Sequence, residues 1–150
     1  MKNILKKLWL LIFFIGIFNF VQACQPFNPD EQNDSVDIQS SELVVLWTSG
    51  DVEVAKKMVF MYVYNAKKYE WWDKITFIIW GPSSKLLADN KKLQEILKKM
   101  KEEGVILKAC KACADQYKVS DKLRELGVDV KYMGKPLTEY IKQGKEILTF

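Results

Sequence analysis

The stretch KKLQEILKKMKEEGVILKACKAC, residues 91–113, holds a helix, a turn and a strand in the order that decides the fold. Four apolar residues in its first half have the i, i+3, i+4 and i+7 spacing of an amphipathic helix over residues 91–103: Leu93, Ile96, Leu97 and Met100. Gly104 accepts the left-handed conformation that ends a helix, and the apolar run after it predicts a buried strand over residues 105–107. A helix followed by a glycine and a strand is a unit from which α/β domains are built.

The same unit occurs twice more toward the end of the chain. Gly127 precedes a predicted strand over residues 128–132, and Gly144 precedes another over residues 147–150. The turns between these segments are short, so the strands should run parallel, with right-handed crossovers through the helices.

Two earlier apolar runs predict the centre of the sheet. Residues 43–47 and residues 75–80 are almost continuously apolar, as expected for parallel strands buried on both faces. Between them, residues 51–67 form a predicted helix whose apolar face is broader than one stripe. This breadth indicates either core packing on two sides or a contact between copies of the chain. The sequence therefore predicts an α/β fold with a five-stranded parallel sheet and helices on its faces.

Small and polar residues follow the predicted strands, at the edge of the sheet where α/β proteins bind ligands. The candidate pocket-lining residues are Thr48, Ser49 and Gly50 after the first strand, Gly81 and Ser83 after the second, and Lys111 after the third. Serine is also favoured at helix starts, so Ser49 and Ser83 have a structural alternative as helix caps. We expect these residues to line a pocket without carrying the chemistry.

Two cysteines follow the third predicted strand and are the candidate catalytic residues. Cys110 lies where that strand gives way to a helix beginning near Lys111, and Cys113 lies one helical turn further on. The partial positive charge of a helix start, with Lys108 and Lys111 nearby, favours the thiolate form of Cys110, and the thiolate is the nucleophile. Two alternatives stay open, which are a buried, inert cysteine and a disulfide between Cys110 and Cys113.

The composition excludes several kinds of site. The chain has no histidine, so Cys–His and Ser–His nucleophile pairs are excluded, and a zinc site would have to be shared between two chains. No glycine-rich phosphate-binding motif is present, and we expect neither a cofactor nor a metal. Residues 43–150 carry a net charge of +6, but their lysines are scattered along several helices, so nucleic acid is not an expected partner.

The first 24 residues have the pattern of an export signal. Three lysines precede an apolar run that is too short to cross a bilayer comfortably. Val21 and Ala23 lie three and one residues before Cys24, an arrangement that resembles a bacterial lipoprotein signal, in which the cysteine is lipidated. Gln22 departs from the small residue usual at its position. There are therefore two alternatives to lipidation. The signal could be cleaved so that Cys24 stays free, or it could remain as an uncleaved anchor.

The segment between this signal and the first predicted strand has little to bury. Residues 25–42 are polar and contain five acidic residues, which predicts a flexible acidic tether. The predicted organisation is a signal at residues 1–24, the tether at 25–42 and an α/β domain at 43–150. We expect the protein to be exported to the periplasm or cell envelope and held at the membrane through a lipid on Cys24.

Several short motifs in the predicted domain occur in a recognisable order. They are GVILKAC at residues 104–110 followed by a helix, then Leu126-Gly127-Val128, Met133-Gly134, Leu137-Thr138 and Leu148-Thr149-Phe150. In this order they resemble the DsrE/DsrF/TusD family, and the resemblance extends from about residue 43 to residue 150. It implies a three-layer α/β/α domain with a five-stranded parallel sheet, assembled as a homo-oligomer, either a trimer or a hexamer.

The resemblance also implies a function. Sulfur-relay members of the family carry sulfur as a cysteine persulfide, and their cysteine follows the third strand, where Cys110 lies in this chain. Cys113 has no fixed counterpart in that pattern, which leaves room for dithiol chemistry. The relay partners of the family are cytoplasmic, so an exported member would serve a different sulfur-donor or thiol partner protein.

Three functions follow as hypotheses. The first is sulfur transfer, in which Cys110 attacks or holds sulfane sulfur and Cys113 resolves the persulfide. The second is thiol–disulfide exchange by the same pair, although the position of the pair after the third strand and the lack of an identifiable cis-proline count against it. The third is a membrane-tethered binding or assembly module without catalysis.

Overall fold

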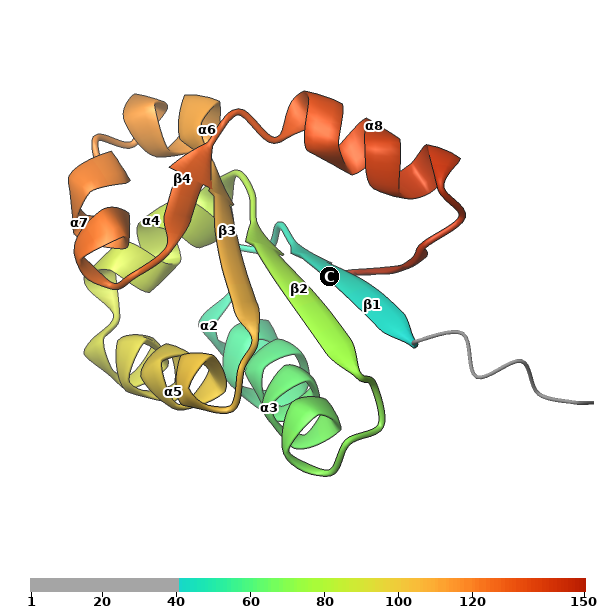
Figure 1. The fold of residues 1–150 in the computed structure, drawn as a ribbon. Helices are drawn as coiled ribbons and strands as arrows, with labels where there is room; N and C mark the ends of the chain where they lie inside the picture. Colours follow the sequence, from blue (N-terminus) through green and yellow to red (C-terminus); the bar gives the residue numbers. More distant parts are fainter. Residues whose placement is uncertain (1–40) are drawn as a thin grey trace, which may run out of the picture. The chain divides into compact units, whose positions relative to one another are not determined.

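The computed structural model describes residues 41–150, so the predicted signal and almost all of the predicted tether lie outside the described residues. In the described part, five strands form one sheet in the order β4-β3-β2-β1-β5, and every neighbouring pair is parallel (Figure 1). The strands are β1 (Glu42–Trp47), β2 (Lys74–Ile79), β3 (Ile106–Cys110), β4 (Asp129–Lys131) and β5 (Glu146–Thr149). The predicted five-stranded parallel sheet is confirmed.

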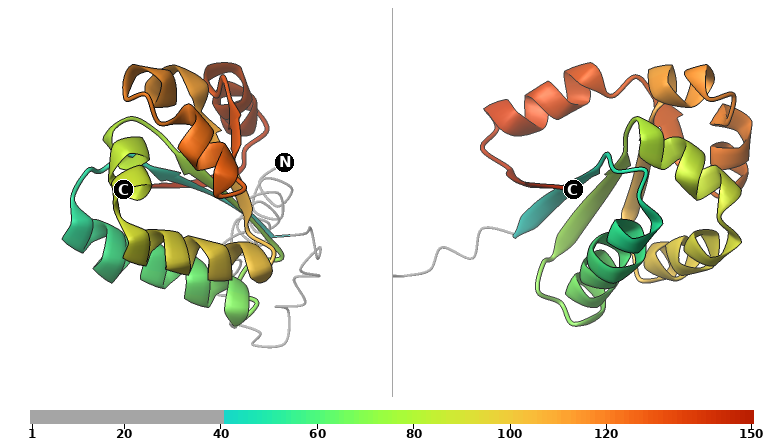
Figure 2. Two further views of the ribbon diagram at one scale, coloured as in Figure 1. Left: turned by 90° about the vertical axis from the view of Figure 1, so that its left-hand side faces the viewer. Right: turned by 180° about the vertical axis from the view of Figure 1, so that it is seen from behind.

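Helical segments connect consecutive strands (Figures 1 and 2). They are α2 (Val52–Val54), η1 (Ala55–Val59), α3 (Phe60–Lys68), α4 (Pro82–Asp89), α5 (Lys91–Glu102), α6 (Lys111–Gln116), α7 (Ser120–Glu125) and α8 (Gly134–Lys142). The first three form one continuous stretch, with a π-helical turn in η1, where the sequence predicts a single helix. Asp51 caps its start, because its carboxylate accepts hydrogen bonds from the backbone N–H groups of Glu53 and Val54 at 2.7 and 3.0 Å.

The three glycines that end helices have the predicted conformation. Gly104, Gly127 and Gly144 have φ angles of +91°, +77° and +66°, which residues with a side chain adopt only under strain. The strand after Gly104 differs from the prediction, because it covers Ile106–Cys110 and continues beyond the apolar run. Lys108 interrupts the apolar run, but its side chain lies on the sparsely covered face of the sheet, where a half-buried lysine is tolerated.

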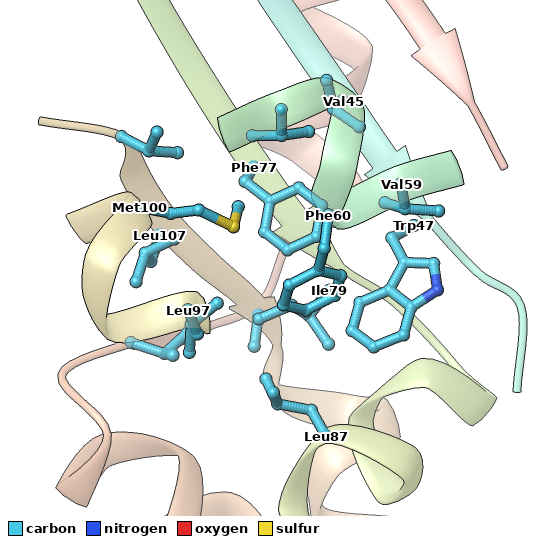
Figure 3. Close-up of a cluster of buried hydrophobic side chains, with 14 of the residues drawn as sticks. Val45, Trp47, Val59, Phe60, Phe77, Ile79, Leu87, Leu97, Met100 and Leu107 are labelled. Carbon is cyan, nitrogen blue, oxygen red and sulfur yellow. The ribbon is translucent and has the colours of Figure 1, made fainter. Parts of the chain in front are cut away.

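The main core fills one face of the sheet and is built around three aromatic rings that contact one another (Figure 3). The Trp47 ring meets the Phe60 ring edge-on at 5.1 Å and lies parallel to the Phe77 ring at 5.9 Å. Leu97 and Met100 of α5 pack into the same cluster, on the buried side of the amphipathic helix that the sequence predicts. This face accounts for every second residue of β1 and β2, and the residues between them, such as Val44 and Ile78, are buried on the other face.

The second face of the sheet has a much smaller core. Val44, Ile78, Cys110 and Met133 form its buried cluster, and side chains of α8 pack against it only partly buried. No residue of α8 is itself buried. The helices therefore lie on both faces of the sheet, but unequally, and Cys110 lies on the more lightly covered side. In the described part of the chain, no helix is long and apolar enough to cross a membrane.

An ion-pair cluster joins three strands at the amino end of the sheet. The Glu42 carboxylate accepts hydrogen bonds from the ammonium groups of Lys74, at 2.8 Å, and Lys145, at 2.7 Å. The bond from Lys145, followed by that from Lys74, lowers the pKa of Glu42 from 4.5 to about 2. Because β1, β2 and β5 begin at these residues, the cluster holds the starts of the three strands together.

The depressed pKa of Glu42 predicts a stability contribution that depends on pH. The contribution should be present above pH 4.5, where the carboxylate is ionised in both the folded and unfolded chain, and it should be lost as the pH falls through about 2. Glu42→Gln should lower the free energy of unfolding at neutral pH by about 1 kcal/mol and flatten its fall between pH 4.5 and 2, measured by thermal unfolding. The control is Glu53→Gln, which breaks an exposed pair with Lys57 and should change little. Identical pH profiles for Glu42→Gln and the unchanged protein would contradict the prediction.

Candidate functional site

Two of the candidate pocket-lining hydroxyl groups at the end of β1 are engaged with the backbone. The Thr48 hydroxyl donates to the carbonyl oxygen of Phe150 at 2.7 Å, and the Thr48 N–H donates to the same oxygen at 2.8 Å. The Ser49 hydroxyl accepts a hydrogen bond from the Asp51 N–H at 3.1 Å. Thr48 therefore holds the last strand beside the first, and Ser49 shapes the turn before α2.

Ser83, at the start of α4, links the ends of β1 and β2. Its hydroxyl is fully buried, lies 2.7 Å from the Trp47 carbonyl oxygen, to which it donates, and accepts from the Trp80 N–H at 3.0 Å. Serine is the fitting residue here because a single hydroxyl can donate to one strand end and accept from the next. Its polar atoms are used inside the fold.

Cys110 is the last residue of β3 and precedes the first residue of α6. Its side chain is 4% exposed and lies in the small cluster with Val44, Ile78 and Met133. The sulfur makes no capping hydrogen bond to α6, which has only six residues. Cys110 thus lies at the strand–helix junction, as the sequence predicts, but beneath the partly buried side chains of α8.

Cys113 lies one turn into α6 and next to Cys110. Both thiols are free, and Cys113 is the more exposed of the two. It packs against the cluster that contains Cys110, and the backbone N–H of Gly81, which follows the neighbouring strand β2, also influences its thiol. Burial raises the pKa of the Cys113 thiol, the adjacent Cys110 raises it further, and the Gly81 N–H lowers it. Cys113 therefore keeps its proton and can donate it to the sulfur of Cys110.

Gly81 is the one pocket-lining candidate whose backbone N–H influences the pKa of a cysteine. It has a φ angle of +72°, so a residue with a side chain would be strained there even though space is available. This conformation directs its N–H toward the sulfur of Cys113. The ends of β2 and β3, which are neighbours in the sheet, thereby meet at the pair of thiols.

The two lysines that flank Cys110 have different surroundings. The ammonium group of Lys111 is paired with the Asp115 carboxylate, so most of its charge is compensated. Lys108 donates to the Tyr140 hydroxyl at 2.7 Å and lies 5.4 Å from the centre of that ring. Because strand residues alternate between faces, Lys108 and Cys110 share one face of β3. Lys108 and Cys110 therefore lie on the same side of the sheet, whereas Lys111 belongs to α6.

A shallow hollow opens on the other side of the same sheet edge. It is lined by residues of the β1 and β2 turns and by the residues around α4: Gly50, Pro82, Lys85, Leu86, Asp89 and Tyr117. Gly50 is the one pocket-lining candidate that belongs to it. Neither cysteine is among the lining residues, so the hollow is a separate surface feature. The described residues contain no group of three or more His, Cys, Asp or Glu side chains that could hold a metal ion.

Three residues around the thiols were not among the sequence candidates. Trp80 follows β2, while Met133 and Tyr140 come from the start and the middle of α8, and all three contribute to the cluster that contains Cys110. The alternation of faces along β2 could have indicated Trp80, because it shares the face of Ile78. Met133 and Tyr140 depend on the path of α8 across the sheet, which no local pattern specifies.

The contact between the thiols predicts how Cys113 titrates. Cys110→Ala should lower the pKa of Cys113 part of the way to its ordinary value, because the contribution of Cys110 is removed whereas burial, the largest cause, persists. The measurement is the rate of iodoacetamide alkylation at Cys113 against pH, followed by mass spectrometry. The control is the same variant unfolded in urea, where both effects are absent. An unchanged pH midpoint in folded Cys110→Ala would show that the two sulfurs do not interact.

Comparison with known proteins supports the fold and identifies the family. The chain matches the model of the DsrE/DsrF-like family over residues 43–150. It is similar to the structure of BT1422, a conserved protein of unknown function from Bacteroides thetaiotaomicron, with 37% identity and a TM-score of 0.72 over 73% of this chain and 95% of that one. The ychN protein from E. coli shares the fold at 16% identity and a TM-score of 0.54, over 74% of this chain and 99% of that one.

No curated protein matches the chain. The parallel sheet, with a strand–helix junction at Cys110 and with helices on both faces, agrees with the fold of the structural neighbours. Since the family model covers most of the chain, from the first residue after Glu42 to Phe150, the protein belongs to the DsrE/DsrF-like family.

Proposed function

We propose that this protein handles sulfane sulfur through Cys110, with Cys113 as the resolving thiol. The observation that carries the proposal is the contact between two free thiols at the carboxyl edge of the sheet. Family membership points to sulfur-relay chemistry in general, and the thiol pair suggests which atoms perform it in this chain.

The first step is the transfer of one sulfur atom to Cys110. The Cys110 thiolate attacks the outer sulfur of a persulfide donor, a new S–S bond forms at Cys110, and the donor leaves as a thiolate. Lys108 lies on the same face of β3 and supports the negative charge of the attacking sulfur. The thiol of Cys113, which keeps its proton, donates a hydrogen bond to the same sulfur.

The second step releases the sulfur. The Cys113 sulfur loses its proton and attacks the Cys110 sulfur, so that a Cys110–Cys113 disulfide forms and hydrosulfide leaves. The two cysteine sulfurs lose two electrons in total, and the sulfane sulfur gains them and becomes sulfide. A thiol partner protein then reduces the disulfide and is itself oxidised. Alternatively, an acceptor thiol takes the outer sulfur directly from Cys110, and Cys113 is not oxidised.

Access to Cys110 requires movement of its cover. The Cys110 side chain is only 4% exposed, and Leu137 and Tyr140 of α8 pack over the cluster that contains it. Because α8 has no buried residue, moving it outward disrupts little packing. The donor sulfur can then approach from the face of the sheet that α8 covers.

The same thiol pair also suits a second function, thiol–disulfide exchange. The specific observation in its favour is that Cys110 precedes α6, Cys113 lies three residues later, and the two sulfurs are in contact. A cysteine pair with this spacing at a helix start is the arrangement that thioredoxin-like redox proteins use. The two functions differ in the substrate, because sulfur transfer requires a sulfane donor, whereas exchange requires a disulfide.

We also propose that the protein is exported and attached to a membrane through its first 24 residues, and that it assembles as a homo-oligomer. The support for attachment is the pattern of lysines, apolar run and cysteine that ends at Cys24. The support for assembly is the resemblance to a family whose members form trimers or hexamers. In an oxidising periplasm the proposed persulfide would be prone to oxidation, and the burial of Cys110 would protect it.

Mass spectrometry tests the thiol chemistry. After incubation with a small-molecule persulfide, the protein should gain one sulfur atom at Cys110, and the gain should disappear in Cys110→Ser. Cys113→Ser should accumulate more of the adduct than the unchanged protein, because the resolving thiol is missing. The opposite result would favour thiol–disulfide exchange. In that case a disulfide substrate would produce a Cys110–Cys113 disulfide, and neither Cys110→Ser nor Cys113→Ser would gain a sulfur atom.

Intact-mass analysis tests the attachment. The protein purified from the membrane fraction of the native host should begin at Cys24 and carry the mass of its lipid, because the signal before it is removed. Cys24→Ser should move the protein from the membrane fraction to the soluble fraction or leave the signal uncleaved. A protein that begins at Gln25 or beyond and is fully soluble would contradict lipid attachment.

A further inference from the structure

A group of exposed aromatic side chains lies on the turn between α3 and β2. Tyr69 is 60% exposed and Trp71 is 56% exposed, and their rings are stacked with centroids 6.2 Å apart. The Tyr62 ring lies 6.1 Å from the Trp71 ring, and Met61, beside it in α3, is 55% exposed. We call Met61, Tyr62, Tyr69 and Trp71 the aromatic turn. The largest apolar patch on a protein surface is often a site of interaction.

The aromatic turn is held rigidly by the backbone. The Tyr69 N–H donates to the Asn65 carbonyl oxygen, and the Trp71 N–H donates to the Ala66 carbonyl oxygen, each at 2.9 Å. Glu70, between the two aromatic residues, has a φ angle of +56°, which is uncommon for a residue with a side chain. The ammonium group of Lys68 lies 5.7 Å from the centre of the Tyr69 ring. The rings are therefore displayed at fixed positions, with a cation beside them.

The aromatic turn lies next to the point where the described chain begins. The Ser41 N–H donates to the Asp73 carboxylate at 2.7 Å, and the Lys74 N–H donates to the Ser41 carbonyl oxygen at 3.2 Å. Asp73 is two residues from Trp71. The segment that precedes Ser41 therefore joins the domain beside the aromatic turn.

This end of the domain is opposite the thiols. In a parallel sheet, all strands begin at one edge and end at the other. β1 begins at Glu42, beside Ser41, whereas Cys110 lies at the far end of β3. Five residues of strand separate the two edges by about 17 Å. A surface placed against the aromatic turn would leave the thiol edge directed away from it.

We propose that the aromatic turn contacts the lipid–water interface of the membrane to which the chain is attached. The inference rests on the proposed attachment through residues 1–24 and is independent of the thiol chemistry. From Cys24 to Ser41 the chain can reach at most about 60 Å, which is less than two diameters of a domain of this size. This length keeps the domain close to the bilayer, and the edge that contains Ser41 is the one to which the tether is joined.

The chemistry of the aromatic turn fits this position. Tryptophan and tyrosine favour membrane interfaces because they combine an apolar ring with a polar atom, and lysine extends its ammonium group toward the headgroups. The charges around the turn are mixed, since Lys67 and Lys68 lie close to Glu70 and Asp73. The contact should therefore depend on the rings more than on anionic lipid.

A second copy of the chain is the competing occupant. Tyr69, Trp71 and Met61 together expose roughly 300–450 Å², well below the about 800 Å² that each partner of a stable interface buries. The turn also projects from one end of the domain, beside the start of the chain. Both features favour an extended lipid surface over a matching protein surface.

Lipid-phase quenching of tryptophan fluorescence tests the inference. The lipidated protein that begins at Cys24, purified from the native membrane fraction, is reconstituted into phosphatidylcholine vesicles, either plain or brominated in the acyl chains, and compared with its Trp71→Phe variant. The difference in emission between the protein and this variant is the emission of Trp71. Bromine in the acyl chains quenches it on contact, so it should be at least twofold weaker in brominated than in plain vesicles. The matched control is Trp80→Phe at the thiol edge, whose lost emission should be equal in the two vesicles. Comparison with these variants removes the contribution of the other tryptophans that follow Cys24.

Each other outcome overturns the inference in a distinguishable way. A chain that does not float with the vesicles contradicts the attachment itself, whereas a chain that floats but whose Trp71 emission is equally strong in both vesicles contradicts only the lipid contact. Sedimentation in detergent addresses the competing occupant. A lower particle mass for Trp71→Ser, with unchanged mass for the exposed-residue control Ile141→Ser, would make the turn a contact between copies and overturn the proposal.

Discussion

The parallel, in-register pairing of β1 with β2 and of β2 with β3 is the constraint on which the site depends. It brings the ends of neighbouring strands to one edge, so that Gly81 after β2 meets Cys113 after β3. The aromatic core of Trp47, Phe60 and Phe77 fixes this pairing, because a shift by one residue would turn Trp47 or Phe77 away from Phe60 and toward the lightly covered face. The contact between the thiols is thus a consequence of how the opposite face of the sheet is packed.

The sequence is sufficient for the fold because its local signals agree. Gly104, Gly127 and Gly144 mark the helix ends at positive φ, and the apolar runs of β1 and β2 identify strands with both faces covered. The π-helical turn at Ala55–Val59 and the extension of β3 through Lys108 could not be predicted in the same way. Both depend on how a segment packs against its neighbours, and the pattern of a single segment does not record this.

The candidate site was predictable in position and not in its interactions. The order of strand, cysteine and helix places Cys110 at the carboxyl edge, but spacing alone treats Lys108 and Lys111 as equivalent cations. In the structure Lys111 is paired with Asp115, whereas Lys108 shares a face with Cys110 and bonds to Tyr140. The burial of Cys110 depends on α8, which reaches it from the end of the chain. The surroundings of this thiol are thus set by long-range contacts that its own segment does not contain.

The separation of the two ends of the domain has a consequence for any partner. If the edge beside Ser41 faces a membrane, the thiols lie at the far edge, about 17 Å of strand away, and face the aqueous compartment. A protein that delivers sulfur to Cys110, or reduces a Cys110–Cys113 disulfide, can then approach without contacting lipid. Helix α8 covers Cys110, and none of its residues is buried. It is the element that such a partner would displace. Attachment at one end and chemistry at the other are therefore compatible in a domain with a single parallel sheet.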